Sequence, residues 1–285
     1  MNFLAIISLS FLLATISVFD YKKNDASLLK SNPKIELPES DFRKFNGYIS
    51  IFLKISKQDN RIVYNLNGAN YTFNELADAI LDSRGNYYNR NEPVYILASY
   101  DLPISEIKKL DVQLFLINKN KIVYVTKNTS PNFTSRVDLK GIERFINFDE
   151  RKVDAYSNLS SVPLPMQPPP FPEKEYLKNQ NQIEVQIGDN YLIDGKPIQK
   201  KDLLSTFKSL IDSTTYFYFQ YADNISYQNY ITVYSKYNQA IFELRKKDEQ
   251  VEYNERYSND EKYLLDQQRV KQKFPMKHFE NYDFD

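Results

Sequence analysis

Hydrophobic and polar residues alternate along short stretches in two separate regions of the chain. Apolar residues occupy every second position over residues 49–55 and 62–66 in the first region, and over 183–187 and 191–193 in the second. A period of two is typical of a β-strand with one buried face. The pattern therefore predicts two strands in each region.

Each pair of predicted strands ends at a dipeptide that favours a tight turn. The two dipeptides are Asn67-Gly68 and Asp194-Gly195, and all three residue types tolerate the positive φ angles that a tight reversal requires. Asp194 and Gly195 lie 127 positions after Asn67 and Gly68, and similar residues follow both turns at the same offset. The constant offset indicates an internal repeat in which these four residues have a structural role.

A helix is predicted after each turn. Thr72 and Glu75 have the spacing of a capping box, in which each side chain satisfies a backbone amide at the start of the helix. Apolar residues within 73–81 then fall on one helix face, and those within 203–211 do the same in the second region.

A strand and a second helix are predicted next in both regions. The apolar runs at 94–98 and 216–222 have the composition of strands, and Ser105 and Ser226 are suitable N-caps for the helices that follow. Both regions share the order strand, strand, helix, strand, helix. This order predicts an α+β fold with helices on one face of each small sheet.

The two regions are expected to diverge after the second helix. In the first, the runs 112–117 and 121–126 predict two strands that complete the sheet. In the second, apolar residues continue at three- and four-residue spacing from Ser226 to Leu244, which predicts one long helix. A tail of mixed charge extends to Lys273, and a solvated helical arm explains it better than a binding surface.

A proline-rich stretch separates the two regions. Six of the 13 prolines lie within 163–172, which favours extended polyproline II structure. We interpret it as a stiff spacer, and the alternative is a ligand for a proline-recognising module. The predicted boundaries are 1–20 for an anchor or signal segment, 21–47 for an extended linker, 48–127 for the first unit, 128–172 for a linker ending in the spacer, 173–250 for the second unit and 251–285 for a charged helical tail.

The N-terminal residues 3–19 carry no charge and are mostly apolar. A helix of this length reaches roughly 26 Å, at the short end of what a bilayer core requires. The segment is either a transmembrane anchor or the apolar part of a secretory signal with a cut before Val18. Under both interpretations the chain after Asp20 lies outside the cytoplasm.

Composition argues against several classes of chemistry. The 37 basic and 37 acidic residues cancel, and no local cluster offers a surface for nucleic acid. With no cysteine, one histidine (His278) and six glycines, the chain has little material for thiol chemistry, metal sites or phosphate loops. Carboxylate pairs can cleave glycosides, but Glu36 and Glu39 lie beside prolines, and Asp194 and Asp202 have turn and helix-start roles. We therefore expect no enzyme activity and no cofactor.

The order of these elements resembles the ExbD/TolR family of biopolymer transport proteins. The resemblance rests on four stretches: PKIELPES at 33–40, YLIDGKPI at 191–198, the run from 221 to 245 and KQKFPM at 271–276. The last three are similar to a form common in Bacteroidota, which has a long helical tail. The resemblance covers nearly the whole chain past residue 32.

The resemblance implies a single-pass protein of the inner membrane with most of its chain in the periplasm. It also implies a homodimer inside a ring of ExbB-like channel subunits, use of the proton-motive force and transfer of work to a TonB-like protein. Within the family one membrane aspartate carries the proton, because a carboxyl group in hydrocarbon is costly when ionised.

That aspartate has no counterpart within residues 3–19. Asp20 lies just past the apolar run and is a weak candidate for a proton role. The sequence therefore leaves two main hypotheses open. One is an energy-transducing periplasmic subunit, and the other is a non-energising periplasmic scaffold that binds a partner protein or the cell wall.

Overall fold

The computed structural model describes residues 35–42, 51–82, 93–117, 119, 121–127, 141–145, 181–222, 224–250 and 261–280. Over these residues the chain is a mixed α+β protein with two β-sheets and five α-helices. The predicted membrane segment, Asp20 and the proline-rich spacer lie outside the described residues. Among the helices that the structure does describe, none has the length and apolar character needed to cross a bilayer.

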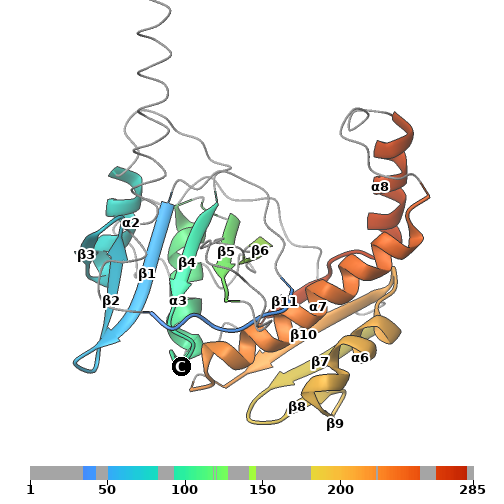
Figure 1. Cartoon of the computed structure of the whole chain (residues 1–285), viewed down its shortest axis with the longest axis horizontal. Coiled ribbons are helices and arrows are strands. Elements are labelled where there is room, and N and C mark those ends of the chain that lie inside the picture. Colours follow the sequence, from blue (N-terminus) through green and yellow to red (C-terminus); the bar gives the residue numbers. More distant parts are fainter. Residues whose placement is uncertain are drawn as a thin grey trace, which may run out of the picture.

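The first sheet has six strands in the order β3-β2-β1-β4-β5-β6 (Figure 1). Its elements are β1 (Ile51–Gln58), β2 (Arg61–Leu66), β3 (Ala69–Tyr71), α2 (Phe73–Asp82), β4 (Val94–Ala98), α3 (Ile104–Leu116), β5 (Lys121–Val125) and β6 (Gly141–Phe145). Strands β1, β4 and β5 are parallel, whereas β2, β3 and β6 join through antiparallel pairs. The Thr72 amide donates to the Glu75 carboxylate at 2.9 Å, which is one half of the predicted capping box. The Thr72 hydroxyl donates to the same carboxylate at 2.7 Å.

The second sheet has five strands in the order β11-β10-β7-β8-β9. Its elements are β7 (Asn181–Ile187), β8 (Tyr191–Ile193), β9 (Lys196–Ile198), the short 3-10 helix η2 (Lys200–Asp202), α6 (Leu203–Leu210), β10 (Thr215–Tyr221), α7 (Tyr227–Asp248), α8 (Glu261–Lys273) and β11 (His278–Glu280). Ser226 is confirmed as the N-cap of α7, because its Oγ accepts a hydrogen bond from the Asn229 amide at 3.3 Å.

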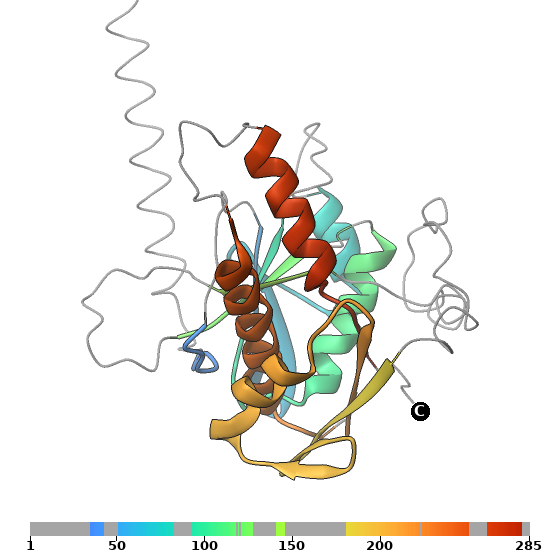
Figure 2. The same ribbon diagram turned by 90° about the vertical axis from the view of Figure 1, so that its right-hand side faces the viewer.

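The expected divergence of the two units after their second helix is confirmed in part: α7 is the predicted long helix and α8 follows it, but the second unit also gains a further strand. Strand β11 pairs in parallel with β10 at the sheet edge, as β5 pairs with β4 in the first unit. Helix α8 lies between α7 and β11 in the chain, and Figures 1 and 2 show it extending away from the second sheet. The predicted helical tail therefore contains a helix but ends as a strand of the second unit.

The prediction of a strand at 112–117 is also wrong, because these residues form the C-terminal half of α3 and the residue after it. Ten of the thirteen residues of α3 are buried. A helix buried on most sides shows no helical period of apolar residues, so its end reads as a short apolar strand. Strand β6 lies within 128–172, where a linker was predicted, and it adds an antiparallel edge to the first sheet.

The buried apolar residues of the two units form one continuous cluster instead of two separate cores. Ile51, Leu53 and Ile55 of β1 belong to it together with Val185 of β7 and residues of helices α2, α3, α6 and α7. The opposite face of the first sheet carries a smaller buried cluster around Phe52 of β1. The alternation predicted along β1 thus divides its side chains between the two faces of the sheet.

Residues 35–42 form a strap that contacts both units. Glu39 makes a parallel bridge with Lys127 beside β5. On α7, the Gln228 side chain accepts from the Glu39 amide at 2.7 Å and donates to the Glu39 carbonyl oxygen at 3.1 Å. This strap, which follows the predicted membrane region in the sequence, is therefore held by elements of both units.

Candidate functional site

Four charged side chains are buried where the two units meet. Lys108 and Asp111 lie on α3 and Arg144 lies on β6, so the first unit supplies three of them. Glu280 on β11 is supplied by the second unit. None of these side chains is more than 2% exposed.

Within the part of the chain that the structure describes, the four charges form a network with two cations and two anions. Lys108 and Arg144 each contact both carboxylates. Lys108 Nζ lies 3.3 Å from Asp111 Oδ2 and also binds Glu280. Arg144 Nη2 lies 3.0 Å from Glu280 Oε2, and Arg144 Nη1 binds Asp111. Buried charges are tolerated when each one has an opposite partner. These four charges therefore balance one another, and they link the two units electrostatically.

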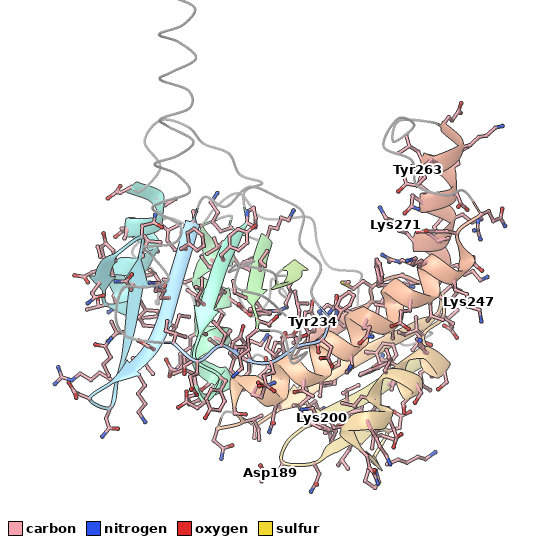
Figure 3. The ribbon with its side chains drawn as sticks, viewed as in Figure 1. Asp189, Lys200, Tyr234, Lys247, Tyr263 and Lys271 are labelled. Carbon is pink, nitrogen blue, oxygen red and sulfur yellow. The ribbon has the colours of Figure 1, made fainter. Side chains whose placement is uncertain are left out.

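Tyrosine side chains surround the charges. The Tyr230 hydroxyl donates to Glu280 Oε1 at 2.9 Å, and the Tyr124 hydroxyl lies 3.2 Å from Asp111 Oδ2. Lys108 Nζ lies 4.1 Å from the centre of the Tyr230 ring, within the range of a cation–π contact. Tyr234, labelled in Figure 3, stacks on Tyr230 with ring centres 5.5 Å apart, at the junction of the two units.

The pKa values of the buried groups reflect competition between burial and charge. Burial alone would raise the pKa of Glu280, but the positive charges of Arg144 and Lys108 outweigh it and lower this pKa to about 2. Burial and the Arg144 charge lower the pKa of Lys108. Burial also lowers the pKa of His278 to about 4. At neutral pH, Glu280 is therefore ionised and His278 is neutral.

The predicted turn residues lie away from this network. Asn67 and Gly68 connect β2 to β3 with φ angles of 50° and 98°, and Asp194 and Gly195 connect β8 to β9 with φ angles of 50° and 70°. In both turns the side chain at the first position accepts a hydrogen bond from a backbone amide of the first strand of its unit: Asn67 from β1 at 3.3 Å and Asp194 from β7 at 3.0 Å. The two turns are thus structurally equivalent.

The four network residues were not singled out in the sequence. A partial signal exists for Lys108 and Asp111, which lie three positions apart on α3, a spacing that brings side chains together. Arg144 and Glu280 carry no such signal, because each becomes buried only through strand pairing with a segment distant in the sequence.

The arrangement suits structural coupling better than bond chemistry. In the described parts of the chain no group of three or more His, Cys, Asp or Glu side chains could hold a metal ion. The carboxylates considered for hydrolysis lie in different elements: Glu36 and Glu39 in the strap, Asp194 in a turn and Asp202 in η2. An open groove of about 470 Å³ lies over Lys54, Asn65 and Asn70 of the first sheet, and no residue of the charge network lines it.

Comparison of the chain with protein-family models, with curated proteins and with solved structures finds no match.

Proposed function

We propose that the chain is a membrane-anchored periplasmic subunit of an energy-transducing complex of the ExbB/ExbD/TonB-like type, driven by the proton-motive force. The observation that carries the proposal is the doubled α+β unit, in which each unit has a strand, a hairpin, a helix, a strand, a helix and a further parallel strand. This order agrees with the repeat on which the sequence resemblance rests. The strap at 35–42 also supports the proposal, since a tether from the membrane would pull on both units at once.

The proposed partners are an ExbB-like channel protein and a TonB-like protein in the inner membrane. A homodimer remains a prediction from the resemblance. The proposed role is mechanical, with no enzyme activity, cofactor or nucleic acid involved. A proton-carrying role of this chain itself within that complex is outside the proposal, because residues 3–19 contain no acid and Asp20 is a weak candidate for that role.

A non-energising periplasmic scaffold is the second candidate function. The missing membrane acid favours it, and so does the buried network, because a rigid pair of units suits a protein that holds a partner in place. Such a scaffold would function with or without its N-terminal segment. N-terminal sequencing of the mature protein tests this difference, since a chain that begins at Val18 has lost its anchor.

The test of the proposed function is affinity purification of the full chain from membranes in mild detergent, with a tag after Asp285. We expect mass spectrometry to identify an ExbB-like channel protein in the purified complex. The matched control replaces residues 1–20 by a cleavable secretory signal, which should abolish recovery of that protein. Absence of an ExbB-like protein from the anchored sample would contradict the proposal.

A further inference from the structure

Apart from β6 in the first unit and η2 and α8 in the second, the two units have the same elements in the same order. In the first, β1 lies between β2 and β4, and β5 is next to β4; in the second, β7 lies between β8 and β10, and β11 is next to β10. The matching pairs β1–β4, β4–β5, β7–β10 and β10–β11 are all parallel. Helices α3 and α7 follow β4 and β10, so they are equivalent as well.

The units meet where these equivalent helices begin. Pro103, the N-cap of α3, forms an antiparallel bridge with Ser226, the N-cap of α7. Two hydrogen bonds flank the bridge, each from the residue after one N-cap to the residue before the other: Ile104 N to Ile225 O (2.8 Å) and Tyr227 N to Leu102 O (2.7 Å). The donor of each bond is equivalent to the donor of the other bond, and so is each acceptor. The two units are therefore related here by a local two-fold axis.

The strand registers extend this equivalence to the charge network. Tyr124 pairs with Ile96, which pairs with Leu53, and Leu53 pairs with the residue before the Asn67 turn. Glu280 pairs with Phe219, which pairs with Val185, and Val185 pairs with the residue before the Asp194 turn. Tyr124 and Glu280 therefore occupy the same position in the two units.

Each of these equivalent side chains reaches across to the other unit. The Tyr124 ring lies 5.7 Å from the Tyr227 ring and 5.9 Å from the Tyr230 ring of α7. Glu280 in turn binds Lys108 of α3. The contacts are reciprocal in position but different in chemistry, because one unit presents a phenol and the other presents a carboxylate.

This difference determines which units can pair. Two first units paired about the same axis would place Tyr124 against Lys108, so that Lys108 and Arg144 would keep Asp111 of their own unit but lose the opposite charge of Glu280. Two second units would place Glu280 against α7, where the buried Ile231 stands five residues after the N-cap, as Lys108 does in α3. A buried charge that loses its partner is strongly unfavourable. The network therefore selects the pairing of unlike units.

We propose that the two units are a built-in pair, in which the first unit binds the second unit of the same chain and the charge network excludes pairing of like units. The covalent connection between β6 and β7 favours pairing within one chain, because a tether gives an effective concentration on the order of millimolar. One chain then presents the surface that two identical subunits would otherwise form. This inference does not depend on the proposed function.

A disulfide across the local axis tests the proposal in the full chain. The chain has no cysteine, so the double variant Pro103→Cys with Ser226→Cys contains a single possible bond. The bridge is of the non-hydrogen-bonded type, in which Cα atoms lie about 4.5 Å apart, a separation that a disulfide can span. We expect oxidation to give an internal disulfide at the mass of one chain.

Two single variants complete this test. Pro103→Cys alone and Ser226→Cys alone should give no covalent dimer on a non-reducing gel. A dimer from either single variant would mean that like units pair, and a dimer from the double variant would mean that units pair between copies. Failure of the folded double variant to form any disulfide would also overturn the proposal.

A second measurement avoids changes at the two N-caps. A specific protease site inserted into residues 163–172 allows the spacer to be cut in the folded protein. We expect the two halves to remain together, with the mass of one chain, and to separate when Glu280→Lys is added. The control Glu243→Lys changes a carboxylate that is about a third exposed and should leave the halves together. Separation of the halves without the Glu280 change would refute the built-in pair.

Discussion

Replacement of Glu280 by Gln tests how strongly the buried network holds the fold together. The amide keeps the size of the side chain and removes its charge. Among the described residues, Lys108 and Arg144 then keep the contact with Asp111 and lose the negative charge of Glu280. We expect a large loss in the free energy of unfolding, because two buried cations would each lose an opposite charge.

The size of this loss follows from two independent arguments. Removing one partner of a buried ion pair costs about 3–5 kcal/mol. The pKa of Glu280, lowered from 4.5 to about 2, corresponds to about 3 kcal/mol of stability at neutral pH. We therefore expect a loss of about 3 kcal/mol or more for Glu280→Gln.

The assay is urea unfolding of the full chain at pH 7, followed by circular dichroism. Glu243→Gln is the matched control, since Glu243 contacts Lys208 with both side chains about a third exposed, and such pairs contribute less than about 1 kcal/mol. A loss below about 1 kcal/mol for Glu280→Gln, or equal losses for both variants, would show that the network does not stabilise the fold.

Three further predictions concern single residues. The pKa of His278 is about 4 in the folded chain against 6.5 for a free imidazole, so the unfolded state takes up the proton at a higher pH than the folded state. The free energy of unfolding should therefore fall by about 3 kcal/mol as the pH drops from 6.5 to 4. His278→Phe should remove that part of the pH dependence of the urea midpoint. Gly195→Ala should lower the free energy of unfolding by about 1 kcal/mol, because φ is +70° at this residue. No steric clash adds to this cost, since a Cβ would meet no atom within 4 Å. Gly188→Ala, at a residue without such a φ angle, should be nearly neutral in the same unfolding assay. Gln228→Ala removes both hydrogen bonds to Glu39, and hydrogen–deuterium exchange of residues 36–41 should accelerate; unchanged exchange would mean that the strap is held by its other contacts.

Local signals in the sequence were sufficient for much of the secondary structure. The strand at 94–98 and the N-cap at Ser226 are confirmed, and so is the hydrogen bond from the Thr72 amide to Glu75 in the predicted capping box. Each of these features depends on residues that are neighbours in the chain, so a pattern of four to ten residues contains the required information. The repeated turns are recognisable for the same reason, because Asn67 and Asp194 adopt a backbone conformation that few other residues tolerate.

Features that depend on distant contacts could not be read from such patterns. The end of α3 was mistaken for a strand, because burial on most sides of a helix removes its periodicity. Strand β11 was missed, because a segment of three residues acquires its strand structure only by pairing with β10.

The sequence by itself determined that the chain repeats one α+β plan and that it contains little material for catalysis. Only the tertiary structure decided that the two copies of this plan share one core and one buried charge network. The physical reason is that Lys108, Arg144 and Glu280 come from three separate segments. Their charges become partners only when the two sheets pack together.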